Sequence, residues 1–527
     1  MLSIIKLKAP YKDFLFALIS AALLVLSFPK PNFYWLAWVG LVPLLIGLQG
    51  KSLGRAFALA FTMGIAFLMG IYYWINVIEN FALTDFFLLG IFLGAYFGFF
   101  GLFYVFISTR TPIPFFVIAP CVWVAIEYAR SLGGFVALPW PFLGYSQFQN
   151  LRLIRIANFS GVYGVSFLLV MANGALTELI VPYLDRSEAR VASRRRWSWF
   201  PGIITAGIFG LCFWYGVNST GEDSPNPTTR VAVIQGNIPQ NLRWNVQLRE
   251  KNLERHVELT RRAAEGGKVS LVVWPETTVQ GSLEQNKYLS DKFTHLAGEL
   301  HSYFLLGSAD RPKFGFDPGR GSHLYNSAFL VSPNGYIAGR YDKIHLLPFG
   351  EYLPWKSFPW PARIASAWAA GEFSPGTTYT LFSLDNHRFG VSICWESIFP
   401  DHFRRFVKQG ATFMVNITNE AWFGKTAAPY QFMAMTVFRA VENRVAIARA
   451  ANTGISGFID PFGRILGVVT KADQDIFVEG FLAMDIPISE DRTFYTEYGD
   501  LFAYACIGFL ILMIGIAFAH RLHNNRG

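Results

Sequence analysis

The sequence predicts two joined parts, a membrane domain of eight transmembrane α-helices and an α/β domain, and three observations support this fold class. Hydrophobic residues make up 52% of the 527-residue chain and charged residues only 15%, a balance too apolar for an ordinary soluble enzyme. Apolar segments long enough to cross a bilayer fill roughly the first 220 residues and recur near the C-terminus. Between them, short apolar runs alternate with helical patterns, as is typical of an α/β fold.

The apolar segments are each close to the length of about 20 residues that a transmembrane helix needs. Seven lie in the N-terminal part, at 12–28, 33–49, 55–78, 86–108, 113–129, 160–181 and 200–217, and the eighth lies at 500–519. We therefore expect a seven-helix domain at 1–217 and an eighth helix with a cytoplasmic tail at 499–527. Gly90, Gly94 and Gly98 share one face of the fourth segment, which predicts close packing against another helix.

Basic residues are divided unevenly between the loops on the two sides of these segments. Cytoplasmic loops carry an excess of Lys and Arg. Thirteen basic residues lie in one set of loops: Lys6, Lys8, Lys12, Lys51, Arg55, Arg110, Arg186, Arg190, Arg194, Arg195, Arg196, Arg521 and Arg526. Leaving the α/β part aside, four lie in the alternate set: Lys30, Arg130, Arg152 and Arg155. This bias predicts that both termini are cytoplasmic and that residues 218–499 are extracytoplasmic. It also explains the net charge of +9 without a nucleic-acid partner.

A polar, turn-rich linker at 218–229 leads into the predicted α/β domain at 230–498. Apolar runs there predict buried strands at Val231–Gln235, Ser270–Val273, Tyr303–Gly307, Tyr325–Val331, Phe389–Ile393, Ala411–Ile417 and Val445–Ala450. Helical patterns lie near 242–265, 284–301 and 429–443.

Three chemically distinctive residues stand at or just beyond strand ends, where α/β folds usually place reacting groups. They are Glu276, Lys343 and Cys394, and only Cys394 among the four cysteines lies outside the long apolar segments. A carboxylate can take the proton of a thiol, and an ammonium group can stabilise the oxyanion of a tetrahedral intermediate. Together the three suffice for acyl transfer through a thioester. Considered singly, Cys394 could be a small buried hydrophobic residue and Lys343 a solvated surface lysine.

The motifs around these residues resemble the signatures of the nitrilase, or carbon–nitrogen hydrolase, superfamily. They are Trp274-Pro275-Glu276, Tyr341-Asp342-Lys343 and Cys394-Trp395-Glu396. Further stretches resemble the apolipoprotein N-acyltransferase family within it: Lys343 to Pro354, Asn419 to Gly424, Pro139-Trp140 and Leu143 to Gln147. The likeness covers nearly the whole chain, although Trp395 stands where Tyr is common.

The resemblance implies an αββα sandwich in which Glu276 is the general base, Lys343 the oxyanion stabiliser and Cys394 the nucleophile. It also implies substrate-binding or supporting residues, which are Glu351, Glu396, Trp244, Trp395, Asn419 and Tyr145. Structural roles stay open for most of them. Glu351 could pair with a basic neighbour, Glu396 could bind backbone N–H groups, the tryptophans could pack, and Asn419 could end a strand. Neither a metal nor a cofactor is implied.

The function implied by the resemblance is lipoprotein maturation in a bacterial inner membrane, with the catalytic domain in the periplasm. A fatty acyl group would pass from a membrane phospholipid to Cys394 and then to the α-amino group of the lipidated N-terminal cysteine of an apolipoprotein. One alternative is a membrane-anchored amidase or nitrilase that uses water as the acceptor. The other is a transporter or scaffold, which the lack of mid-membrane charges disfavours.

The stretch from Leu346 to Ala370 directly follows Lys343 and is rich in Trp, Phe and Pro. A long apolar loop is a liability on a water-facing surface but is favourable at a membrane interface. This composition predicts a mobile lid that guides lipid to Cys394, with a loop packed permanently on the helical domain as the alternative.

Overall fold

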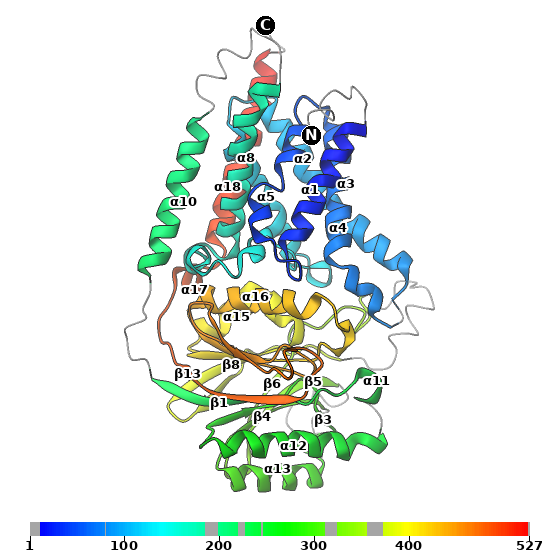
Figure 1. The fold of residues 1–527 in the computed structure, drawn as a ribbon, viewed down its shortest axis with the longest axis vertical. Coiled ribbons are helices and arrows are strands. Elements are labelled where there is room, and N and C mark those ends of the chain that lie inside the picture. The colour runs from blue at the N-terminus through cyan, green and yellow to red at the C-terminus, as the bar shows by residue number, and fades with distance from the viewer. Residues whose placement is uncertain are drawn as a thin grey trace. The chain divides into compact units, whose positions relative to one another are not determined.

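A computed structural model describes residues 11–79, 81–184, 199–219, 227–243, 246–310, 324–355 and 373–524 of the chain. Contacts divide the chain into two compact units. The helical unit comprises 1–76, 81–220 and 498–527, and the α/β unit comprises 77–80 and 221–497. The α/β unit is therefore inserted in sequence between the last two long helices of the helical unit, α10 and α18 (Figure 1).

The helical unit consists of long apolar helices joined by short ones. The longer helices are α1 (Tyr11–Ser27), α3 (Leu53–Ile71), α4 (Leu83–Ser108), α5 (Phe115–Ser131), α8 (Val162–Leu184), α10 (Phe200–Asn218) and α18 (Leu501–Asn524). The short ones are η2 (Tyr34–Trp38), α2 (Val42–Gly47), η3 (Tyr73–Val77), η4 (Gly134–Val136), η5 (Leu143–Gln147), α6 (Leu151–Ile154) and α7 (Ala157–Ser160). Within the described residues, 5 helices are long and apolar enough to cross a membrane: α3, α4, α8, α10 and the 501–520 part of α18. Helices α1 and α5 have 17 residues each.

The segment predicted at 33–49 forms two short helices, η2 and α2, and not one continuous helix. Pro43 lies in the first turn of α2, where its missing N–H costs nothing and its ring disfavours a helix before it. The buried side chain of Asn173 in α8 satisfies the interrupted backbone. It accepts from Leu41 N at 2.8 Å and donates to Ala37 O at 2.9 Å. Irregular backbone in an apolar surrounding needs such partners.

The packing predicted for the glycines of the fourth segment is confirmed, and the partner helix is α3. A Cβ atom added at Gly94 would lie 2.7 Å from Ile65 Cγ1, and one at Gly98 would lie 2.6 Å from the ring of Phe57. Both distances are too short for real atoms, so α4 can approach α3 this closely only because glycine has no side chain.

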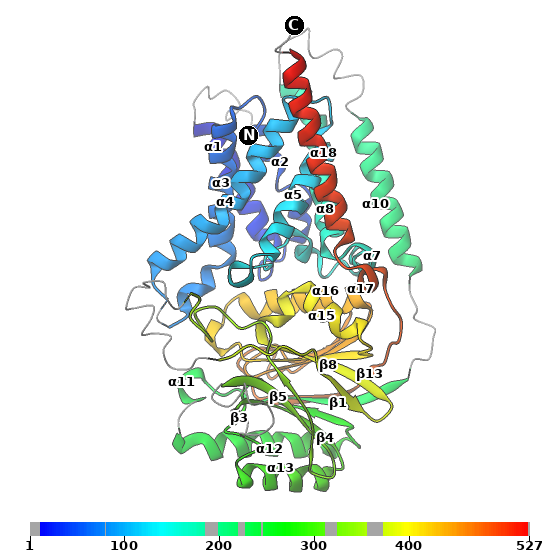
Figure 2. The ribbon, with the colours of Figure 1, turned by 180° about the vertical axis from the view of Figure 1, so that it is seen from behind.

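The α/β unit has two central sheets between two layers of helices (Figures 1 and 2). Helices α12 (Arg249–Glu265) and α13 (Lys287–Leu300) cover one sheet, and α15 (Pro400–Lys408) and α16 (Ala428–Asn443) cover the other. An apolar core fills the space between the first sheet and its helices, with Trp274, Phe293 and Phe304 among its buried side chains. The arrangement is the αββα sandwich that the resemblance implied.

The first sheet has the strand order β13-β1-β2-β4-β5-β6, with β3 paired to β4. Its strands are β1 (Thr228–Gln235), β2 (Leu271–Val273), β3 (Val279–Gln280), β4 (Tyr303–Asp310), β5 (Tyr325–Val331), β6 (Ile337–Asp342) and β13 (Gly480–Pro487). The second sheet has the order β12-β11-β10-β9-β8-β7. Its strands are β7 (Leu381–Leu384), β8 (His387–Ile393), β9 (Phe413–Thr418), β10 (Ala446–Ala451), β11 (Gly457–Ile459) and β12 (Ile465–Val468). The described residues form five further helices, α11 (Gln240–Arg243), η6 (Val246–Leu248), η7 (Cys394–Ile398), η8 (Ala421–Phe423) and α17 (Phe494–Tyr498).

Each predicted strand is present, and the parallel pairs bring several strand ends to one side of the sandwich. In the first sheet β1, β2 and β4 are parallel, and in the second β8, β9 and β10 are parallel. Residues that follow the carboxyl ends of these strands can therefore meet.

Candidate active site

Each of the three predicted catalytic residues follows a strand. Glu276 lies beyond β2, Lys343 directly follows β6, and Cys394 directly follows β8. Cys394 begins the short helix η7 and has a φ of 56°, in the left-handed region that side chains other than glycine seldom adopt. A cysteine held in that conformation turns its thiol out of the strand direction, as a nucleophile at a strand end requires.

The segment that carries Glu276 crosses very close to β4. A Cβ atom added at Gly307 would lie 2.6 Å from Pro275 O and 2.8 Å from Glu276 Cα. Only glycine leaves room for this crossing, so Gly307 helps to determine where the carboxylate lies.

The Glu276 carboxylate is buried and held by fixed donors on both oxygens. Asn326 Nδ2 donates to Oε1 at 2.8 Å, and the backbone N–H of Asn419 donates to Oε2 at 2.9 Å. Lys343 Nζ lies 3.4 Å from Oε1. The carboxylate is thus positioned in advance rather than free to rotate.

Lys343 is 1% exposed and lies between two carboxylates. Its Nζ donates to Glu351 at 2.9 Å, and Glu276 is the second carboxylate. Burial alone would lower the pKa of Lys343, but Glu351 and then Glu276 outweigh it and raise the pKa above its usual value. The side chain is therefore a fixed ammonium group at neutral pH, suited to stabilise an oxyanion and not to act as a base.

The Cys394 thiol is protonated in this surrounding at neutral pH. Burial, followed by the charge of Glu276, raises its pKa to about 12, although Lys343 acts in the opposite direction. A thiol is a poor nucleophile, so its proton has to leave as the sulfur attacks. Glu276 is the carboxylate whose charge acts most strongly on the thiol.

Glu396 joins the segment after Lys343 to the strand that ends at Cys394. Its Oε1 accepts from the backbone N–H groups of Ile344 and His345 at 2.7 and 2.9 Å, and its Oε2 accepts from Ile393 N at 2.7 Å. Burial would raise the pKa of Glu396, but His402, followed by His345 and the Ile393 N–H group, lowers it to about 2. The carboxylate stays ionised and serves as a structural clamp.

The other predicted site residues lie in different places. Trp395 is buried, and its indole N–H donates to His345 O at 2.5 Å, which braces the loop after Lys343. Asn419 contributes its backbone N–H to Glu276, while its side chain donates to Gln240 at 2.9 Å. Tyr145 is buried in η5 of the helical unit and stacks on Phe142, so its place at this site stays a prediction.

Two parts of the sequence prediction fall outside the described residues. Trp244 is one of them. Most of the proposed lid, from residue 356 onward, is the other. Of the lid's described part, Glu351 accepts from Leu347 N at 2.7 Å, and Trp355 is exposed.

Three residues in contact with the site were not predicted. Asn326 donates to both Glu276 and Glu351, and Tyr341 and His402 both contact Glu396. The signal available for Asn326 was a polar residue inside an otherwise buried strand, since a buried amide needs partners. Nothing local to the sequence marks His402, which lies on α15, whereas Glu396 lies on the preceding short helix η7.

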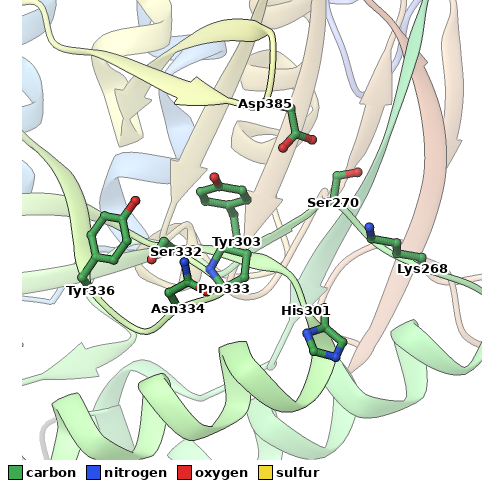
Figure 3. Close-up of a pocket in the computed structure, with 9 residues that line it drawn as sticks. All are labelled: Lys268, Ser270, His301, Tyr303, Ser332, Pro333, Asn334, Tyr336 and Asp385. Carbon is green, nitrogen blue, oxygen red and sulfur yellow. The ribbon is translucent and has the colours of Figure 1, made fainter.

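A pocket of about 430 Å³ lies elsewhere on the α/β unit (Figure 3). Ser270 and Tyr303 line it at the starts of β2 and β4, together with Asp385 from the turn between β7 and β8. Glu276 follows the opposite end of β2, so this pocket does not belong to the site around Cys394. No group of three or more potential metal ligands occurs among the residues that the structure describes.

Comparison with known families matches both parts of the chain. The carbon-nitrogen hydrolase family matches residues 230–486, and the apolipoprotein N-acyltransferase N-terminal domain matches residues 20–175. A solved structure of Saccharomyces cerevisiae Nit3, of the nitrilase superfamily, aligns with a TM-score of 0.35 and 19% identity over 49% of this chain and 90% of that chain. The nitrilase-like fold of the α/β unit rests on the family match over residues 230–486.

Relatives that match nearly the full length carry one name. The apolipoprotein N-acyltransferase of Geobacter metallireducens is 36% identical over 522 residues, which cover 97% of this chain and 96% of the relative. That of Chlorobaculum tepidum is 29% identical over 94% of this chain and 95% of the relative. Because the identity extends through the helical unit and the α/β unit alike, the chain belongs to the apolipoprotein N-acyltransferase family.

Proposed function

We propose that this protein transfers a fatty acyl group from a membrane phospholipid to the α-amino group of the lipidated N-terminal cysteine of apolipoproteins. The observation that carries the proposal is the gathering of Glu276, Lys343 and Cys394 at strand ends of a nitrilase-like unit, in a chain whose relatives are named for this activity. The catalytic roles of the three residues are part of the proposal.

In the first half-reaction, Cys394 Sγ attacks the ester carbonyl while its proton passes to Glu276. The Lys343 ammonium stabilises the oxyanion of the tetrahedral intermediate. Collapse breaks the ester C–O bond, and the departing lysophospholipid takes the proton from Glu276. A thioester remains on Cys394.

In the second half-reaction, the amine of the acceptor attacks the thioester carbonyl and gives a proton to Glu276. Collapse of the second intermediate breaks the C–S bond and leaves an amide. Cys394 leaves as a thiolate and recovers its proton from Glu276. The amide is more stable than the thioester, so the transfer runs forward.

The membrane setting of the proposal has eight spans, with domains at 1–217 and 230–498, a linker at 218–229 and the last span from 499. Long apolar helices support a membrane location. The loop charges support cytoplasmic termini and a periplasmic catalytic domain in a bacterial inner membrane.

Intact-protein mass spectrometry tests the proposal directly. The purified full-length protein, incubated with a phospholipid of defined acyl chains, should gain the mass of one acyl group, and hydroxylamine should release it. Cys394→Ala should gain no mass, and Glu276→Gln should acylate about 10² to 10⁴ times more slowly. An adduct that persists in Cys394→Ala would place the nucleophile elsewhere.

Adding a diacylglyceryl peptide with a free N-terminal amine to the acylated protein distinguishes transfer from hydrolysis. Transfer should move the acyl label onto the peptide amine. Release of free fatty acid with no acylated peptide would identify a hydrolase instead.

A further inference from the structure

The C-terminal end of β9 lies beside Cys394 and leads directly into the residue that holds Glu276. β8 and β9 are parallel and pair Ile393 with Ile417, so the next residues along the two strands are Cys394 and Thr418. The residue after Thr418 is Asn419, whose N–H donates to Glu276 Oε2 at 2.9 Å. Thr418 therefore lies beside Cys394 and directly precedes Asn419, the residue that holds the Glu276 carboxylate.

The position of Thr418 is fixed by its other neighbours. It pairs with Ala451 of β10 on the far side of β9, and its carbonyl oxygen accepts from Asn452 N at 3.1 Å. The residue is fully buried. Asn416, two residues earlier on the same strand, donates to Cys394 O at 3.4 Å, which ties β9 to the backbone of the nucleophile.

The Thr418 hydroxyl is not occupied by another interaction. In the resting geometry Oγ1 completes no hydrogen bond with any atom of the described residues. It nevertheless lies close enough to the thiol to lower the pKa of Cys394, against the larger raising effects of burial and Glu276. A buried hydroxyl without a partner is costly, and catalytic hydrogen bonds often tighten only as charge develops.

We propose that Thr418 is a further catalytic residue, whose Oγ1–H donates a hydrogen bond to Cys394 Sγ whenever the sulfur carries negative charge. This assignment deepens the proposed function and rests on it. The sulfur becomes anionic twice, when Glu276 removes its proton and when the thioester collapses. Thr418 keeps its own proton throughout, so it stabilises both events without taking part in proton transfer.

Alkylation of Cys394 by iodoacetamide tests the proposal without lipid or acceptor, because only the thiolate reacts. The rate at Cys394 is measured by peptide mass spectrometry on full-length protein in detergent between about pH 7 and pH 9.5. Thr418→Val removes the hydroxyl and keeps the shape of the side chain. We expect it to slow alkylation about tenfold at every pH in this range, as a rise of about one pKa unit would.

Two further variants separate catalysis from packing. Thr418→Ser keeps a hydroxyl and should restore the rate to within about twofold of wild type. Thr436→Val makes the same chemical change at a buried threonine of α16, whose Oγ1 donates to Phe432 O, and should leave the rate unchanged. A wild-type rate in Thr418→Val would overturn the proposal. Equal slowing in Thr418→Val and Thr418→Ser would also overturn it, since that result means a packing role.

The same variants keep this inference distinct from the proposed function. If the wild type forms no acyl-enzyme with phospholipid but the alkylation rates still order as expected, the lipid donor is wrong and the role of Thr418 stands. If acylation proceeds and the alkylation rates do not differ, the lipid donor stands and the role of Thr418 is wrong.

Discussion

At the scale of single residues, Glu396 shows how a buried charge can serve the site without reacting. Its oxygens accept from backbone N–H groups on both sides of the site and from the Tyr341 hydroxyl at 2.9 Å. His402 Nε2 lies 3.4 Å from Oε2. An ionised carboxylate with this many donors is stable in a buried position. It keeps the strand end before Cys394 and the loop after Lys343 at a fixed separation.

Replacing Glu396 with Gln should destabilise the protein in a pH-dependent way. The amide turns an N–H₂ group toward N–H donors, so at least one backbone N–H group loses its acceptor, at a cost of about 1–3 kcal/mol at pH 7. The folded-state pKa of about 2 lies below the ordinary value of 4.5. The stabilisation from ionised Glu396 is therefore fully present above about pH 4.5 and is lost as the pH falls toward 2.

Thermal unfolding of the full-length protein in detergent measures this effect. The melting temperature of Glu396→Gln should fall below that of wild type at pH 7, and the gap should narrow on acidification below about pH 4.5. Glu490→Gln, at an exposed position, is the matched control and should melt like wild type. A gap that stays constant with pH would mean that the charge of Glu396 does not stabilise the fold.

Sequence signatures placed Glu276, Lys343 and Cys394 correctly at strand ends, because each lies in a local motif. They could not find Thr418 or Asn326. Thr418 meets Cys394 through the register of two parallel strands, and Asn326 meets Glu276 across 50 residues of chain. Cross-strand register depends on the whole sheet, which no local pattern specifies.

At the scale of elements, the interrupted segment formed by η2 and α2 depends on α8. Asn173 satisfies a backbone acceptor and a backbone donor of the interruption, and the Ser20 hydroxyl accepts from Leu44 N at 2.9 Å. An apolar surrounding offers no water to replace these partners. The interruption could not be predicted from residues 33–49, because these residues are almost all apolar and the side chains that stabilise the interruption lie on α1 and α8.

Asn173→Leu should therefore destabilise the helical unit. Leucine has a similar volume but leaves Leu41 N and Ala37 O without partners, at a cost of about 1–3 kcal/mol each. The measurement is the loss of native protein on heating in detergent, followed by size-exclusion chromatography. Thr177→Val is the control, because among the described residues this buried hydroxyl donates to Asn173 O, within its own helix. Equal stability of Asn173→Leu and Thr177→Val would contradict the importance of the interruption.

Some elements of the α/β unit were not visible in the sequence, and β13 shows why. Its residues are mostly half-buried, and its apolar run is short, because it ends at Met484, just before the charged Asp485. The strand exists because it pairs along its whole length with β1, from Thr228↔Pro487 to Gln235↔Gly480. Strands that are buried along their whole length, such as β5 and β9, were predicted because most of their residues are apolar.

At the scale of the whole molecule, the order of the parts along the chain leads to a prediction of topology. In sequence, the α/β unit is inserted between α10 and α18, so an apolar helix precedes its first residues and another follows its last residues. With the loop charges, this predicts that a reporter fused at Asp223, outside the described residues, is active only beyond the cytoplasm. A phosphatase that folds only outside and a fluorescent protein that folds only inside give opposite readings. Fluorescence at this position, without phosphatase activity, would reverse the orientation.

The interruption of the second apolar segment also constrains how the chain can be made. The backbone N–H of Leu41 forms its hydrogen bond with Asn173, which is synthesised 132 residues later. At a ribosomal speed of about 5–20 residues per second, the delay is roughly 7 to 26 seconds. During that time the segment formed by η2 and α2 has a backbone N–H group that lipid cannot satisfy. The segment formed by η2 and α2 therefore reaches its final position in the bilayer late in biogenesis, after α8 has been synthesised.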